Sequence, residues 1–211
     1  MSFKVPVRII SIFCFISLII GSSSCSEQAT EKDISPLKRT SPLDFSDIAL
    51  SYSEIRTIGS QISNIQTQYS QNLISQDIAE QRTQQTLQPM VANGRAIYAR
   101  ILENVRLDDP QFELTTQEIE AIQNMSDPHM AEISLIMGIA YSPSGWDQDT
   151  VLNCLSAALG IYEIANLIEN TRQLMTAQGT IRVIKLIGRR YLGWLGVMLA
   201  IHSFGDCMEA W

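Results

Sequence analysis

The sequence predicts an all-α protein, and three observations lead to this prediction. Apolar residues recur at spacings of three and four along much of the chain, which is the period of a helix face. Helix-capping residues stand where new helices are expected, as at Thr115 with Glu118 three positions later. Nowhere do apolar and polar residues alternate as they do in a half-buried strand. We expect a helical bundle with a long N-terminal helix and a compact apolar C-terminal helical subdomain.

Residues 1–24 are predicted to be a signal peptide. Lys4 and Arg8 precede an apolar run of roughly 12 residues, which is too short for a comfortable transmembrane span. The apolar run ends in small residues immediately before Cys25. This segment resembles the lipobox of bacterial lipoproteins, although Ser22 stands where Leu is usual. The resemblance implies cleavage by a signal peptidase of type II and acylation of Cys25. The alternative is ordinary secretion with cleavage near Ser24 and a free Cys25.

Residues 25–45 are predicted to be a flexible tether, because they are polar and contain Pro36 and Pro42 without apolar periodicity. The acidic stretch after Cys25 resembles the tether of surface-exported lipoproteins in some Gram-negative bacteria. Two or more acyl chains would attach the protein firmly to a membrane without any spanning helix. The expected location is the cell envelope, as an outer-membrane lipoprotein exposed at the cell surface.

Residues 46–106 are predicted to be an N-terminal helical segment. Its first stripe runs from Ile55 to Tyr69 and indicates either a helix packed on its own chain or one that pairs with a partner. Asn72 and Gln76 interrupt this register. Pro89 then ends or restarts the helix, and a second stripe follows up to Val105.

Residues 107–211 are predicted to be a C-terminal helical domain. Thr115 and Ser126 open its first two helices, and Asp147 or Asp149 caps an apolar helix over 150–168. The next helix, from about Thr180, carries basic residues on one face and isoleucines on the other. The basic residues are Arg182, Lys185 and Arg189.

The last apolar stretch, from Gly188 to Cys207, decides how the domain is built. Its charge-free part runs from Tyr191 to Phe204, about 14 residues, and as a helix reaches only about 21 Å, against about 30 Å for a hydrocarbon core. We therefore expect helices 150–168 and 190–204 to bury each other. The alternatives are an element that inserts into or lies on a membrane, and a docking surface.

The cysteines support the same pairing. Cys14 leaves with the signal peptide and Cys25 is the lipid acceptor, so Cys154 and Cys207 remain as a pair in an oxidising compartment. A disulfide between them is expected, and two buried thiols are the alternative. The segments around these cysteines, CLSAALGI and IGRRYLGWLGVMLAIHSFGDCM, resemble the C-terminal region of uncharacterised secreted proteins and lipoproteins of Bacteroidota-type bacteria. That resemblance implies a compartment and a cysteine pair, and no activity.

Motifs for catalysis or metal binding are not found in the sequence. His129 and His202 have no ligand at suitable spacing, and Asp147 and Asp149 are interpreted as helix caps rather than a calcium loop. We expect no cofactor and no metal, and we infer no small-molecule substrate. After loss of the signal, 13 basic residues against 22 acidic ones leave a net charge of 13 − 22 = −9, which disfavours nucleic-acid binding.

The sequence therefore predicts a non-enzymatic, lipid-anchored cell-envelope protein. It would be a surface interaction or structural module, attached to the membrane by its lipid and bound to an unidentified envelope partner. The alternative is a membrane-active effector, bacteriocin-like or pore-forming, that uses the glycine-rich apolar C-terminal helices. An enzyme with an unfamiliar site is a third hypothesis, which carboxylates such as Glu132 or Glu163 clustered in one deep pocket would favour.

Overall fold

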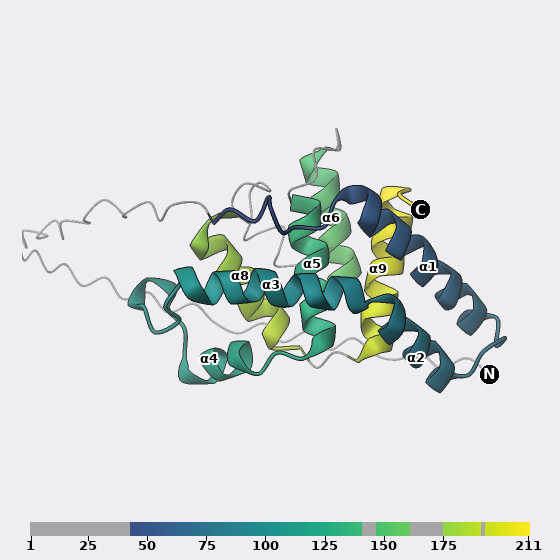
Figure 1. Cartoon of the computed structure of the whole chain (residues 1–211), viewed down its shortest axis with the longest axis horizontal. Coiled ribbons are helices and arrows are strands. Elements are labelled where there is room, and N and C mark those ends of the chain that lie inside the picture. The colour runs from purple at the N-terminus through teal and green to yellow at the C-terminus, as the bar shows by residue number, and fades with distance from the viewer. Residues whose placement is uncertain (1–42, 141–146, 161–174, 191–192) are drawn as a thin grey trace, which may run out of the picture. The chain divides into compact units, whose positions relative to one another are not determined.

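The computed structural model of the protein describes residues 43–140, 147–160, 175–190 and 193–211 (Figure 1). Within these ranges the chain forms eight α-helices, one 3-10 helix and no strand, which confirms the all-α prediction. All described residues belong to one compact unit. The elements are α1 (Tyr52–Ser70), α2 (Gln76–Thr86), α3 (Gln88–Asn104), η1 (Pro110–Phe112), α4 (Thr116–Gln123), α5 (Asp127–Ala140), α6 (Gln148–Leu159), α8 (Ala177–Gly188) and α9 (Trp194–Met208).

Helix α1 buries its apolar stripe within the same chain. The helix begins at a capping box, in which the Glu54 carboxylate accepts a hydrogen bond from the Ser51 N–H at 2.8 Å. Its isoleucines are buried, and the helix packs against α9 and α5. The interpretation of a helix packed on its own chain is therefore confirmed. Asn72, at which an interruption was expected, adopts a left-handed conformation (φ 56°) between α1 and α2.

Helix α3 crosses α5, and these two helices make the most extensive contact between elements (Figure 1). The two backbones lie close together at Gly94, where any Cβ would overlap the backbone of Met130. The contact joins the two predicted ranges, 46–106 and 107–211, through one hydrophobic core. A glycine is required here because two backbones meet, as at close helix crossings generally.

Helix α9, which contains most of the last apolar stretch, packs one side against other helices of the chain and leaves Leu199 exposed on the other. It packs on α6, α1, α2 and α5, and Val197, Met198, Ile201 and Phe204 are buried. The expectation that this stretch fills the protein's own core is confirmed. None of the helices that the structure describes is both long and apolar enough to cross a membrane.

Two predicted boundaries differ from the structure. The apolar helix expected over 150–168 ends at Leu159, because Gly160 takes a left-handed conformation (φ 63°) as its C-cap; residues 161–168 lie outside the described residues. The tether was expected to reach residue 45, but Leu43 and Phe45 are buried in the core, and Phe45 has an exposed fraction of 0%. Burial of these two side chains offsets the entropy of ordering this short segment.

Candidate functional site

Of the predicted cysteine sites, the structure describes the Cys154–Cys207 pair but not Cys25. Cys154 of α6 and Cys207 of α9 form a disulfide; their Cα atoms are 5.6 Å apart, and the two residues are 53 positions apart in sequence. The bond fastens the two apolar helices that pack on each other. Cys25, the predicted lipid acceptor, lies outside the described residues.

The two histidines take part in hydrogen bonds that link helices. His129 Nδ1 accepts from the Ser126 N–H at 3.0 Å, so Nε2 carries the proton and donates to the carbonyl oxygen of Arg190 at 2.8 Å. His202 contacts Ser63 through Nδ1 at 3.0 Å and Asp206 through Nε2 at 3.3 Å. Among the described residues, no group of three or more His, Cys, Asp or Glu side chains could hold a metal ion.

The N-cap of α6 was predicted to be either Asp147 or Asp149. The Asp147 carboxylate accepts from the Thr150 N–H at 2.9 Å, so Asp147 is the N-cap of α6 and Asp149 lies in its first turn. The Thr150 hydroxyl also donates to this carboxylate at 2.8 Å, and the two hydrogen bonds from Thr150, the side-chain one first, hold the pKa of Asp147 below its usual value. The interpretation of Asp147 as a helix cap is confirmed.

Glu132 is a buried carboxylate on α5 with an exposed fraction of 0%. Arg190 donates to its Oε1 at 3.0 Å, whereas Oε2 has no hydrogen-bond partner among the described residues. Burial raises the pKa of Glu132 to about 7, and the nearby Arg190 guanidinium opposes that rise. Glu163, the other carboxylate considered for catalysis, lies outside the described residues.

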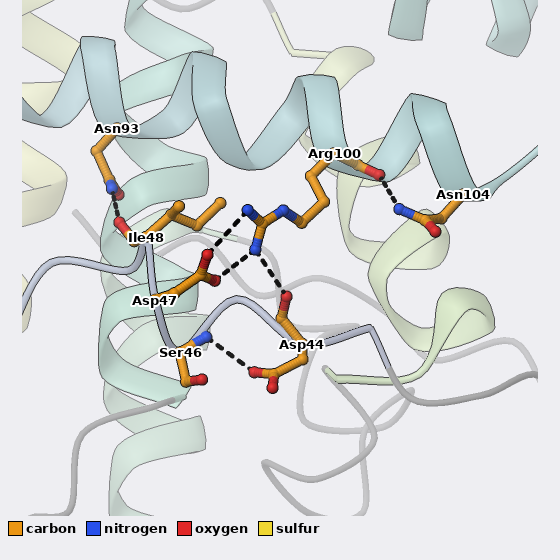
Figure 2. Close-up of polar contacts among 7 residues, drawn as sticks. All are labelled: Asp44, Ser46, Asp47, Ile48, Asn93, Arg100 and Asn104. Carbon is orange, nitrogen blue, oxygen red and sulfur yellow. Dashed lines mark hydrogen bonds and ion pairs between the residues drawn. The ribbon is translucent and has the colours of Figure 1, made fainter.

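The first described residues form an arm (residues 43–50) that is fastened to α3 by polar contacts (Figure 2). Arg100 binds both carboxylate oxygens of Asp47, with Nη2 donating to Oδ2 at 3.0 Å, and Nη1 also donates to the carbonyl oxygen of Asp44 at 3.2 Å. Asn93 donates to the carbonyl oxygen of Ile48. The bidentate pair with Arg100 holds the pKa of Asp47 below its usual value.

Beside this arm lies the first hollow, a cavity of about 590 Å³ between the arm, the end of α3, η1 and the start of α8. Arg100 and Arg106 line it, but each is already paired with an aspartate. Arg106 binds Asp108 with Nη2 2.9 Å from Oδ2. As far as the described residues show, the first hollow is therefore polar without an excess of positive charge.

A second hollow of about 350 Å³ lies on the other side of η1, against α8. Gln111 and Phe112 line both hollows and separate them. The basic residues predicted to share one face of α8 all line the second hollow. It is formed by Gln111, Phe112, Glu113, Leu114, Gln178, Ile181, Arg182, Lys185, Leu186 and Arg189.

Glu118 of α4 forms ion pairs with two of these basic residues, Lys185 and Arg189. It is buried, with an exposed fraction of 5%, and closes the predicted capping box by accepting from the Thr115 N–H at 2.8 Å. Its other oxygen, Oε1, accepts from Lys185 Nζ at 3.0 Å and also from Arg189. One carboxylate thus joins the start of α4 to the basic face of α8.

No protein-family model, curated protein or solved structure matches this chain. The functional assignment therefore depends on the residues themselves. Sequence reasoning identified the basic face of α8 and the Thr115 capping box separately. It missed the second hollow, because Glu118 and Arg189 are 71 positions apart and only the folded chain brings them together.

Proposed function

We propose that this protein is a non-enzymatic, lipid-anchored module of the bacterial cell envelope that binds a partner at the cell surface. Cys25 would carry the lipid, directly after an apolar run and a set of small residues. The observation that best supports a binding module is the compact helical body, in which α9 packs its buried side chains on four other helices. In such a protein the lipid on Cys25 would provide attachment to the membrane, and the surface of the helical body would bind the partner.

Two further features support this proposal. The disulfide between Cys154 and Cys207 suits an oxidising compartment, where such bonds form and persist. Glu132, the described carboxylate considered for catalysis, pairs with Arg190 and lines neither hollow. The resemblance to secreted proteins and lipoproteins of Bacteroidota-type bacteria supports the same compartment.

The membrane-active alternative requires the apolar face of α9 to reach lipid. In the structure that face lies on α6 and α1, and the disulfide holds α9 to α6. Dye release from liposomes separates the two functions. We expect the purified body to release no dye above the buffer control, and release at low protein concentration would favour the effector.

Metabolic labelling with radioactive palmitate tests the anchor. We expect label in the wild-type protein, none in Cys25→Ala, and label retained in Cys14→Ala, which removes a cysteine of the predicted signal peptide. Equal labelling of the Cys25→Ala variant and the wild type would refute lipidation at Cys25.

A further inference from the structure

We propose that the second hollow binds a small organic anion that carries a carboxylate or phosphate head on an apolar tail. This inference gives the proposed binding function a ligand class and depends on that function. It concerns the residues of η1 and α8 described above, for which the sequence analysis inferred no small-molecule ligand.

The head of the ligand would meet three cations on one face of α8. Arg182, Lys185 and Arg189 are spaced by three and four positions, so they project from the same side of the helix, and all three line the hollow. Arginine and lysine are the side chains that bind carboxylate and phosphate oxygens most strongly. Glutamine amides at positions 111 and 178 add donors to the same lining.

The charge count of the hollow remains positive after its carboxylates are included. Glu118 contacts Lys185 and Arg189, and Glu113 lines the hollow. Counted over the described residues, three cations against two carboxylates leave 3 − 2 = +1. The first hollow offers no such excess, because its two arginines are each paired with an aspartate.

Of the three cations, Arg182 is the one that the described part of the chain leaves open to a ligand. Its side chain is exposed, and among the described residues no carboxylate or hydrogen-bond acceptor pairs with it. Lys185 and Arg189 are held in place by Glu118, which reduces the entropy lost when a ligand orders them. The hollow thus combines two positioned cations with one that has no partner in the described part of the chain.

The tail of the ligand would lie on an apolar wall. Phe112 and Leu114 contribute from the η1 side, and Ile181 and Leu186 from α8. Glu113, between Phe112 and Leu114, adopts a left-handed conformation (φ 48°, ψ 42°) that residues other than Gly, Asn and Asp adopt rarely. Strained backbone of this kind concentrates at binding sites. A volume of about 350 Å³ is at the lower end of the range for small-molecule pockets.

Calorimetric titration of the mature chain tests the proposal, with Cys25→Ala introduced so that no acyl chain competes. The ligands are octanoate and octyl phosphate, with octanol as the uncharged control and inorganic phosphate as the head without a tail. We expect one molecule of either octyl anion to bind per chain, and both controls to bind at least about tenfold more weakly.

Arg182→Gln should weaken binding about tenfold, because it removes one charge-assisted hydrogen bond. Arg182→Lys should restore most of the affinity. Arg56→Gln is the matched control: it makes the same change on the exposed surface of α1 and should bind as the wild type does. Loss of affinity in Arg182→Gln alone also separates a binding role from a general effect of net charge.

The anion could come from a free metabolite or from a lipid headgroup, and vesicle flotation distinguishes these sources. Flotation with phosphatidylglycerol vesicles, lost in Arg182→Gln and retained in Arg56→Gln, would indicate a headgroup; binding of the soluble anions alone would indicate a free ligand. Both results support the proposal. The proposed anion site is refuted if neither the octyl anions nor the vesicles bind, or if octanol binds as tightly as octanoate. It is also refuted if Arg182→Gln and Arg56→Gln bind the ligands with the same affinity. The palmitate experiment is independent of all these outcomes.

Discussion

The indole ring of Trp211 lies directly over Gly205 of α9, where any Cβ on the glycine would overlap the ring. The chain reverses at Glu209, which is left-handed (φ 49°), and Ala210 N–H donates to the carbonyl oxygen of Gly205 at 2.9 Å. Gly59 of α1 faces the same ring. The last residue of the chain thus fills a space between α1 and α9 that two glycines leave open.

This relationship predicts a reversal of sign in a double-mutant cycle. Gly205→Ala alone should lower the free energy of unfolding by about 1–3 kcal/mol, because the added methyl group displaces the ring. In a Trp211→Ala background the same change should raise that free energy by about 1 kcal/mol, since alanine is the better helix former. Urea unfolding of the four proteins measures both effects. Equal costs of Gly205→Ala in the two backgrounds would refute the contact.

Glu118 should stabilise the fold in two ways, by completing the capping box of α4 and by pairing with Lys185 and Arg189. Two substitutions distinguish these contributions. Glu118→Ala removes both the capping box and the contacts with Lys185 and Arg189, so we expect a loss of about 2–4 kcal/mol in the free energy of unfolding. Glu118→Gln keeps an acceptor for the Thr115 N–H and should cost clearly less. Glu54→Ala, in the exposed capping box of α1, is the control and should cost about 1 kcal/mol. If all three variants unfold at the same midpoint, the double role of Glu118 is wrong.

Glu132 should make the protein less stable as pH rises from about 4.5 to about 7. Its pKa in the folded protein is raised from 4.5 to about 7, so in this window the folded state holds a proton that the unfolded state has released. The free energy of unfolding should therefore fall by up to about 3 kcal/mol across the window. Denaturant unfolding at pH 5 and pH 8 should show this difference in the wild type and a smaller one in Glu132→Gln. Glu120→Gln, at an exposed position on α4, should keep the wild-type profile.

The disulfide should account for a large share of the stability. Removing a bond that closes a loop of this length costs about 4 kcal/mol in the chain-entropy treatment, since the unfolded chain regains its freedom. The double variant Cys154→Ala/Cys207→Ala should therefore unfold at a lower denaturant concentration than the oxidised wild type. The reduced wild type should approach the double variant. An unchanged midpoint in both would show that the bond is not formed.

Short-range sequence patterns predicted most of the helices correctly, but they could not predict which distant residues come into contact. The Thr115 capping box and the Asp147 cap follow from spacing alone, because neighbours in sequence make these contacts. The helical period likewise predicts the stripe from Ile55 as the buried face of α1, but not the helices that cover it. The end of α6 at Gly160 was missed, because apolar residues continue beyond it and the helical period does not show the left-handed turn.

The candidate site was predictable only in part. The basic face of α8 is legible from the spacing of Arg182, Lys185 and Arg189. Its wall is not, because Phe112 and Leu114 reach α8 only after the chain has passed through α4 and α5. The pairing of Glu132 with Arg190, 58 positions apart, likewise depends on how α5 meets the end of α8.

The account depends most on the burial of α9 within its own chain, and sedimentation velocity without detergent tests this directly. The mature Cys25→Ala protein lacks the proposed lipid, so its solubility reports on the helices alone. We predict a single discrete species that stays in solution in detergent-free buffer. Heterogeneous aggregates that disperse only when detergent is added would contradict the account, because they would show that the apolar face of α9 is exposed.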